Sequence, residues 1–205
     1  MNQTKLHSII DSAVECLLHD GVVLLPTDTV YGLAVHPDSD IAFQKIYALK
    51  NRPTHLKLPF MVATIEDMES LGLDLNSHAV KLINSGFIPG AISLVVGFKE
   101  PPKRKYLAGR EEIAIRIPDD ENLLAILART GPLLVTSANI HGKEGTPRTV
   151  KEILAELNGV PDLVIDGDIV ENIHSTIVNC RQNPPVIERE GLIPAEDILN
   201  IFING

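Results

Sequence analysis

The chain has 205 residues, of which 44% are hydrophobic and 22% are charged, and this balance excludes disordered, collagen-like and coiled-coil proteins. A length of about 150 residues per domain predicts a single domain over residues 1–205, which can bury a core without disulfides. The net charge of −9 argues against a protein that binds the phosphate backbone of nucleic acid over much of its surface. Weak RNA binding would therefore need a local basic patch.

Features typical of membrane or secreted proteins are missing from the sequence. The longest nearly apolar stretch, residues 91–98, is too short to span a bilayer. The N-terminal sequence MNQTKLH has no charged segment followed by an apolar one. Cys16 and Cys180 show neither metal-ligand spacing nor a disulfide framework. We therefore expect a cytoplasmic protein with no membrane partner and no metal site made only of protein ligands.

Hydrophobic spacing, capping residues and helix breakers predict helices and strands in a mixed order. Gly21 stands where a C-cap glycine belongs, and Thr64 to Asp67 has the pattern of a capping box. Because strict alternation is absent, we predict an α/β (α+β) fold, a twisted mixed β-sheet flanked by helices. The predicted elements are helix 5–20, strand 22–25, helix 38–49, strand 59–63, a short helix after residue 64, helix 76–85, strands 91–98 and 112–117, helix 119–129, strand 132–136, helix 149–157, strands 163–165, 175–178 and 186–188, and helix 194–202.

Two polar segments follow predicted elements closely. The segment Pro26–Leu33 (PTDTVYGL) follows a buried strand, where it suits either a ligand site or a turn whose Thr and Asp bind backbone amides. Lys50 and Arg52 lie at the end of a helix and just past it. They either complement the helix dipole or clamp a polyphosphate. Because the glycine-rich phosphate loops GxxxxGK[ST] and GxGxxG are absent, side chains must supply much of the charge for any bound phosphate.

Other candidates are ambiguous when each is taken alone. Ser137 and Asn139 end an apolar strand, where they suit a phosphate, ribose or base edge but are also common turn residues. Arg116 lies opposite the isoleucines of its strand, so it faces either solvent or a carboxylate in a site. The basic run from Lys99 to Lys105 is most simply a solvated loop.

In order and spacing, these segments resemble the threonylcarbamoyl-AMP synthase family, also called YrdC-like proteins. No string is decisive alone, but together they follow the family's order from about residue 21 to 191, in the short form without an extra C-terminal domain. The matching strings are PTDTVYGL (26–33), KNRP (50–53), PG (89–90), IAIRIP (113–118), TSAN (136–139) followed by Gly142, STIV (175–178), and Arg189 with Gly191.

The resemblance implies a fold with a concave, positively charged groove and a nucleotidyltransferase activity. The family joins L-threonine, bicarbonate and ATP, used with Mg²⁺, into threonylcarbamoyl-adenylate and pyrophosphate. A separate tRNA threonylcarbamoyl transferase complex then modifies tRNA with the product.

The resemblance also implies roles for individual residues. ATP and its phosphates would be bound by Lys50, Arg52, Ser137, Asn139 and Arg189, with Lys50 and Arg52 as the catalytic cations. Threonine would be bound by Thr29, Arg116 and Ser175.

The sequence departs from the family pattern in two places, and two rival functions remain open. The segment 54–60 differs after KNRP, which puts an ATP contact near Leu56 in doubt, and His141 replaces a serine. One rival is a non-catalytic RNA-binding or ribosome-maturation module of the same fold. The other is a carbamoyl-adenylate domain of the hydrogenase-maturation type, although its zinc-finger and acylphosphatase segments are absent from the sequence.

Overall fold

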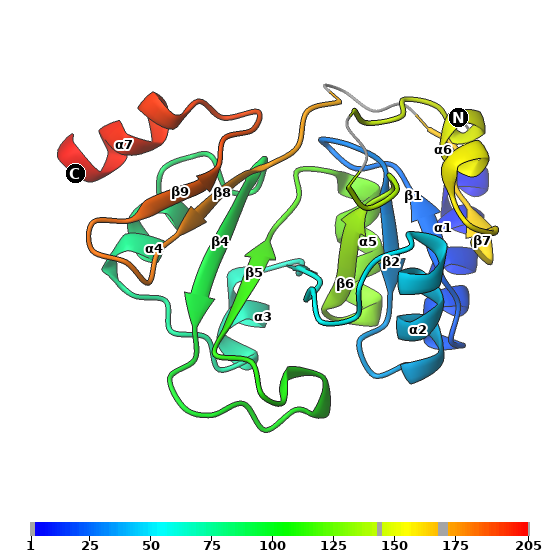
Figure 1. Ribbon diagram of the computed structural model, residues 1–205, viewed down its shortest axis with the longest axis horizontal. Coiled ribbons are helices and arrows are strands. Elements are labelled where there is room, and N and C mark those ends of the chain that lie inside the picture. The colour runs from blue at the N-terminus through cyan, green and yellow to red at the C-terminus, as the bar shows by residue number, and fades with distance from the viewer. Residues whose placement is uncertain (1–2, 143–144, 168–171, 205) are drawn as a thin grey trace.

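One nine-stranded β-sheet organises the described part of the chain, residues 3–142, 145–167 and 172–204 of the computed structural model (Figure 1). Its strand order is β7-β1-β2-β6-β3-β5-β4-β8-β9. The pairs β1–β7, β3–β5 and β4–β8 are parallel and the other neighbours are antiparallel, so the predicted mixed sheet is confirmed. The strands are β1 (Val23–Leu25), β2 (Gly32–Val35), β3 (Phe60–Met61), β4 (Ile92–Gly97), β5 (Glu112–Arg116), β6 (Leu133–Ser137), β7 (Leu163–Val164), β8 (Thr176–Asn179) and β9 (Val186–Arg189).

Helices flank this sheet, and side-chain caps fix several of their starts. The predicted capping box is present at the start of α3, where Thr64 and Asp67 satisfy each other's backbone amides. Asp120 caps α5 by accepting from the Leu123 amide at 2.8 Å. None of the described helices is long and apolar enough to cross a membrane. The helices are α1 (Gln3–Leu18), α2 (Asp40–Leu49), α3 (Ile65–Ser70), α4 (Ser77–Ile83), the 3₁₀ turn η1 (Lys105–Leu107), α5 (Glu121–Thr130), α6 (Val150–Glu156) and α7 (Ala195–Asn204).

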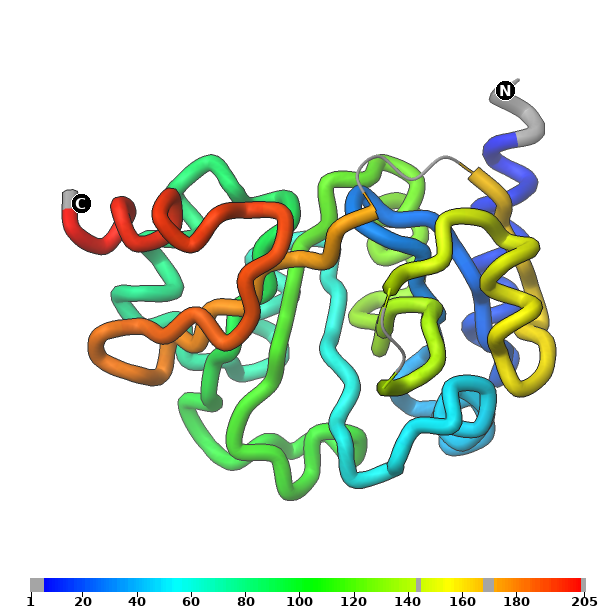
Figure 2. The backbone as a smooth tube through the Cα atoms, turned by 45° about the horizontal axis from the view of Figure 1, so that its top comes forward, coloured from blue at the N-terminus to red at the C-terminus, as the bar shows by residue number. Residues whose placement is uncertain are grey.

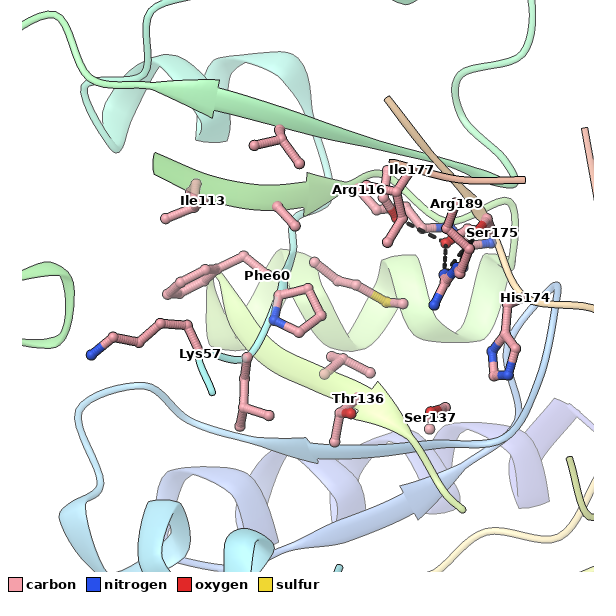
Figure 3. Close-up of a pocket in the computed structure, with 18 of the residues that line it drawn as sticks. Lys57, Phe60, Ile113, Arg116, Thr136, Ser137, His174, Ser175, Ile177 and Arg189 are labelled. Atoms are coloured by element: carbon pink, nitrogen blue, oxygen red, sulfur yellow. Dashed lines mark hydrogen bonds between the residues drawn. The ribbon is translucent and has the colours of Figure 1, made fainter. Parts of the chain in front are cut away.

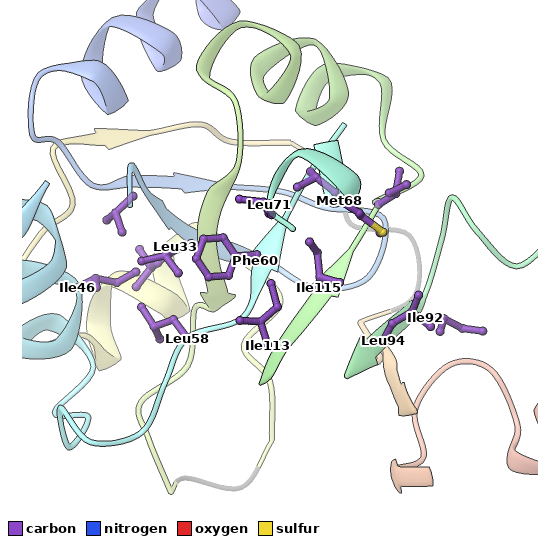
Figure 4. Close-up of a cluster of buried hydrophobic side chains, with 14 of the residues drawn as sticks. Leu33, Ile46, Leu58, Phe60, Met68, Leu71, Ile92, Leu94, Ile113 and Ile115 are labelled. Atoms are coloured by element: carbon purple, nitrogen blue, oxygen red, sulfur yellow. The ribbon is translucent and has the colours of Figure 1, made fainter. Parts of the chain in front are cut away.

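Two apolar clusters hold the helices on the sheet. In the smaller cluster, Leu17 of α1 and Leu127 of α5 pack with Val23 and Val135 of the strands. The larger cluster packs α2, α3 and α4 against the sheet around side chains such as Phe60 and Ile115, which are fully buried (Figure 4). Each such side chain contributes roughly 1.5–3 kcal/mol through removal from water. These contacts make the strand ends rigid supports for polar side chains.

The two-residue strand β3 is the junction between two halves of the sheet, β7-β1-β2-β6 and β5-β4-β8-β9 (Figures 1 and 2). Phe60 pairs with Ile115 of β5 and with Leu134 of β6, and Met61 pairs with Arg116 and with Leu133. These pairs place Arg116 level with Leu133 across β3, so the two halves of the sheet are joined through this short strand.

Strand β2 is an element that the sequence analysis did not predict, because it assigned residues 26–33 to a loop. Gly32–Val35 pairs with β1 on one side and with β6 on the other. All four residues (GLAV) are apolar and buried. The segment therefore lacks the alternation of polar and apolar residues that usually reveals a strand in the sequence. The 3₁₀ turn η1 was also not predicted.

Gly21 is required for a reason other than the predicted one. The helix α1 ends at Leu18, and Asp20 takes the left-handed conformation with a φ of +60°. Gly21 instead lies against the end of the helix, where a Cβ would fall 2.3 Å from Cys16 Sγ. A glycine is therefore needed here for close approach.

Candidate active site

A cavity of about 410 Å³ lies at the junction of the two sheet halves (Figure 3). Six of the eight predicted site residues line it: Thr29, Arg52, Arg116, Ser137, Ser175 and Arg189. The other two, Lys50 and Asn139, are not among its lining residues, but both bond to the turn that carries Ser137. Side chains that lie up to 160 residues apart in sequence thus meet in one place.

Arg116 is buried at the end of β5 and is held on three sides. Its Nη2 lies 2.6 Å from Asp28 Oδ2, its Nη1 donates to Thr29 Oγ1 at 2.9 Å, and its Nε donates to the Gly90 carbonyl at 2.8 Å. A guanidinium has five N–H donors, so two remain for a ligand. Burial lowers the pKa of Arg116, and Asp28 opposes that shift.

The loop between β1 and β2 is shaped by its two threonines. Thr27 Oγ1 donates to the Val30 carbonyl at 2.6 Å and accepts from the amides of Thr29 and Val30 at 3.1 and 3.2 Å. This is the turn chemistry that the sequence analysis offered as the alternative to a ligand site. Both descriptions hold, because Thr27 closes the turn while Thr29 lines the cavity and bonds to Arg116.

Arg189 and Ser175 form the other side of the same corner. Arg189 Nη2 donates to the Ser175 carbonyl at 2.8 Å and to Ser175 Oγ at 3.3 Å, and Ser175 Oγ lies 2.9 Å from Ser93 Oγ (Figure 3). Partial burial and the neighbouring Arg116 cation lower the pKa of Arg189. Two arginines that repel each other beside two hydroxyls form a corner that favours an anion.

The second corner contains Lys50 and the turn after β6. Lys50 is 2% exposed, and its Nζ donates hydrogen bonds to the backbone carbonyls of Ser137 and Asn139. Its third N–H donor remains for a ligand. Burial, with a smaller effect from Arg52, lowers the pKa of Lys50 to about 7. Ser137 Oγ donates to Asn139 Oδ1 at 2.6 Å, which fixes the Asn139 side chain.

Arg52 lines the cavity and lies just before the segment 54–60, which departs from the family pattern. Its Nε donates to the Leu56 carbonyl at 3.3 Å and its Nη2 donates to the Lys57 carbonyl at 3.2 Å. Tyr47 also donates to the Leu56 carbonyl, at 2.7 Å. The segment 54–60 is therefore folded around the guanidinium of Arg52, which stays at the edge of the cavity.

The cavity lining is more basic than acidic although the chain as a whole is acidic. Five cationic side chains line it, against two carboxylates. Within the described ranges, no three His, Cys, Asp or Glu side chains come together in a way that could hold a metal ion. The cations are Arg52, Lys57, Arg110, Arg116 and Arg189, and the carboxylates are Glu112 and Glu188.

Asp28, Ser93 and His174 are among the residues at the site that were not singled out from the sequence. Asp28 lies within the PTDTVYGL string, and its pairing with Arg116 depends on a contact across 88 residues. Ser93 is a single polar residue in an otherwise apolar strand, and that polarity was the available signal. His174 immediately precedes Ser175 and lines the cavity.

The basic run from Lys99 to Lys105 lies away from the cavity lining, in the connection between β4 and β5. Lys105 Nζ is 2.6 Å from Asp40 Oδ2, and the Arg104 guanidinium lies 5.9 Å from the centre of the Tyr106 ring. Two of the four cations in this basic run, Lys105 and Arg104, therefore already have partners within the protein.

Comparison with known proteins agrees with this geometry. The sequence profile of the Sua5/YciO/YrdC family, described as telomere recombination, matches residues 15–191. A Bacillus subtilis protein named threonylcarbamoyl-AMP synthase is 33% identical over 192 residues, which are 92% of this chain and 55% of that protein. The chain thus spans about half the length of this curated relative.

Solved structures match over nearly the whole chain. Pyrococcus abyssi Sua5, solved in complex with L-threonine, superposes with a TM-score of 0.83 and 29% identity over 94% of this chain and 56% of that one. Escherichia coli YciO superposes with a TM-score of 0.81 and 25% identity over 93% of each chain. With its profile match over residues 15–191, the chain belongs to the Sua5/YciO/YrdC family.

Proposed function

We propose that the chain is an L-threonylcarbamoyladenylate synthase, which forms threonylcarbamoyl-AMP and pyrophosphate from L-threonine, bicarbonate and ATP. The names of its relatives and the threonine bound to the Pyrococcus abyssi protein support this assignment. The product would be consumed by a tRNA threonylcarbamoyl transferase complex. The chain would thus act as a nucleotidyltransferase in tRNA modification.

The observation that carries the proposal is the pair of cationic corners within one cavity. One corner contains Arg116 and Arg189, and the other contains Arg52, with Lys50 behind Ser137. The reaction must bring together two anionic reactants, a carbamate of threonine and the triphosphate of ATP. Cations that neutralise both allow the two to approach, and positioning then supplies much of the rate.

At the first corner, Arg116 would bind the threonine carboxylate with its two remaining N–H donors. Thr29 and Ser175 would orient the amine or the carbamate through their hydroxyls. A carbamate oxygen would then attack the α-phosphorus of ATP, and pyrophosphate would leave. No covalent enzyme intermediate is needed, so the side chains act by orientation and by charge.

At the second corner, Lys50 and Arg52 would neutralise the charge that develops on the phosphorus and on the leaving pyrophosphate. Ser137 and Asn139 of this corner, together with Arg189 from the first corner, would position the nucleotide. Phosphoryl chemistry of this class uses Mg²⁺ to neutralise phosphate charge. The ion would enter the site together with the phosphates of ATP.

The direct test measures pyrophosphate release and adenylate formation by the purified chain with ATP, bicarbonate and threonine, and again with serine in place of threonine. We expect formation of both products to depend on all three substrates and to be faster with threonine. Salt-sensitive RNA binding without any threonine-dependent pyrophosphate release would instead favour the RNA-binding alternative.

A further inference from the structure

His174 occupies a place in the cavity that the roles described above leave unused. The ring lines the cavity directly beside Ser175 in the chain (Figure 3). It is close enough to both Arg189 and Lys50 for their charges to affect its pKa. In Figure 3 the ring lies between Ser175 and Arg189 on one side and Ser137 on the other, that is, between the corner assigned to threonine and the corner assigned to phosphate.

The backbone around His174 is fixed from both sheet halves. Its carbonyl accepts from the backbone amide of Leu192 at 2.8 Å. The neighbouring residue must be a glycine, because a Cβ at Gly191 would fall 2.2 Å from the same carbonyl oxygen. Two residues earlier, the Asn172 amide donates to the Thr29 carbonyl at 3.0 Å. These contacts hold the segment against the threonine corner.

The imidazole ring is also held by a side chain. His174 Nε2 lies 3.1 Å from Thr146 Oγ1, and the Thr146 carbonyl accepts from Asn172 Nδ2 at 3.1 Å. A ring whose one nitrogen bonds to a hydroxyl has a preferred orientation, as is usual for histidines that transfer protons. Among the described residues, no side chain bonds to its Nδ1.

The other groups that line the cavity are poorly suited to accept a proton. Glu112 forms an ion pair with Arg181, and Glu188 Oε1 accepts from Asn179 Nδ2 at 2.7 Å. The remaining ionisable lining groups are cations. Burial, followed by Arg189 and Lys50, lowers the pKa of His174, so the imidazole is neutral at pH 7 and able to accept a proton.

We propose that His174 is the proton acceptor that activates the amine of threonine for carbamate formation. This inference rests on the proposed function. The threonine ammonium gives one proton to an imidazole nitrogen, and the nitrogen lone pair then forms a bond to the carbon of bicarbonate. The C–OH bond breaks, and the hydroxide leaves as water with a second proton from the nitrogen. The products are the carbamate, water and an imidazolium, so atoms and charge balance.

The charges of the cavity favour this sequence of events. Arg189 and Lys50 make the His174 imidazolium less stable. Arg116 and Arg189 would do the same to a bound ammonium, so the pKa of the donor and that of the acceptor are shifted in the same direction. Formation of the carbamate adds a negative charge that attracts the same cations and the new imidazolium. The proton can leave later to solvent, because His174 is only half buried.

The experiment compares wild type with His174→Gln and His174→Ala, using threonine-dependent pyrophosphate release from pH 5.5 to 9. The bicarbonate pool itself changes with pH, so the quantity to examine is the ratio of wild-type to variant rates at each pH. We expect a loss of roughly 10²-fold at pH 8, within the usual range for a general base. The ratio should rise with pH below 6.5, as the wild-type imidazole loses its proton, and then level off. Added imidazole should restore part of the rate of His174→Ala.

Binding measurements and a control variant separate this role from a structural one. His19→Gln, on an exposed histidine just past α1, should keep wild-type rates. Threonine and ATP should bind His174→Gln within about twofold of wild type. Near-wild-type rates in either His174 variant would overturn the proposal, as would a loss explained entirely by weaker threonine or ATP binding. If the wild type itself releases no pyrophosphate with threonine, the proposed function fails, and the role of His174 fails with it.

Discussion

Arg116 Nη2 lies 2.6 Å from Asp28 Oδ2, and the two side chains are only 5% and 10% exposed. A surface pair in the same protein, Arg129 with Asp11, has the same 2.6 Å separation but is 48% and 64% exposed. The chain thus contains two arginine–aspartate pairs that differ mainly in burial. The comparison isolates what the buried pair contributes to the fold.

We predict that Asp28→Asn lowers the free energy of unfolding by about 3 kcal/mol, because it leaves the Arg116 cation buried without its counter-charge. The matched change Asp11→Asn should cost at most about 1 kcal/mol, as is usual for exposed pairs. Urea denaturation of both variants at pH 7 measures the difference. Equal losses in the two variants would mean that burial of the Arg116 pair carries no special weight.

Arg116→Lys should weaken threonine binding by about 1–3 kcal/mol, the scale of hydrogen bonds to charged groups, because a lysine keeps the charge but removes the guanidinium fork. ATP affinity measured without threonine should change little. Titration calorimetry with each ligand separately gives both values. Arg129→Lys is the control and should leave both affinities unchanged. An Arg116→Lys variant with wild-type threonine affinity would make Arg116 a structural residue only.

The local part of this site was predictable from the sequence. Alternation over residues 113–117 correctly put the three isoleucines into the core and Arg116 on the cavity, although Ile113 also contributes to the cavity lining. That prediction needed only the two-residue period of a strand and the high cost of burying an unpaired arginine.

The long-range part was not predictable in this way. The choice of Asp28 as the partner of Arg116, and of the Ser137 carbonyl as a partner of Lys50, depends on how β3 joins the two sheet halves. Lys50 was expected to reach a phosphate from the end of a helix. Its side chain is also buried against a turn 87 residues later, and one N–H donor is left for the predicted phosphate contact. No local pattern encodes such a contact.

The lowered pKa of Lys50 predicts that ATP binding takes up a proton. Above the free-state pKa of about 7, most Lys50 side chains are neutral. A bound polyphosphate stabilises the ammonium and raises that pKa, so uptake should be clear at pH 8 and should vanish well below pH 7. Calorimetry in buffers of different ionisation enthalpy measures the uptake.

The Lys50→Met variant should lose this uptake, whereas Lys45→Met, at a partly exposed ion pair with Asp162, should keep it. Buffer-independent heats in the wild type would contradict a titrating Lys50.

In steady-state assays, Lys50→Ala and Arg52→Ala should each reduce adenylate formation by roughly 10²-fold, because a cation beside the phosphates is lost.

Asn139→Ala should weaken ATP binding by about tenfold and leave threonine affinity within about twofold. The Asn139 side chain accepts from Ser137 Oγ at 2.6 Å, so its removal both deletes an amide and frees the hydroxyl to rotate. A loss of one such hydrogen bond is worth about 1 kcal/mol, and a tenfold change corresponds to about 1.4 kcal/mol. The hydrogen bond from Lys50 Nζ to the backbone carbonyl of residue 139 does not depend on the Asn139 side chain, so the turn itself should persist. Asn158→Ala, on an exposed asparagine that bonds to the end of α2, is the control and should bind ATP normally. A selective loss of threonine affinity in Asn139→Ala would show that the two corners of the cavity hold the opposite ligands.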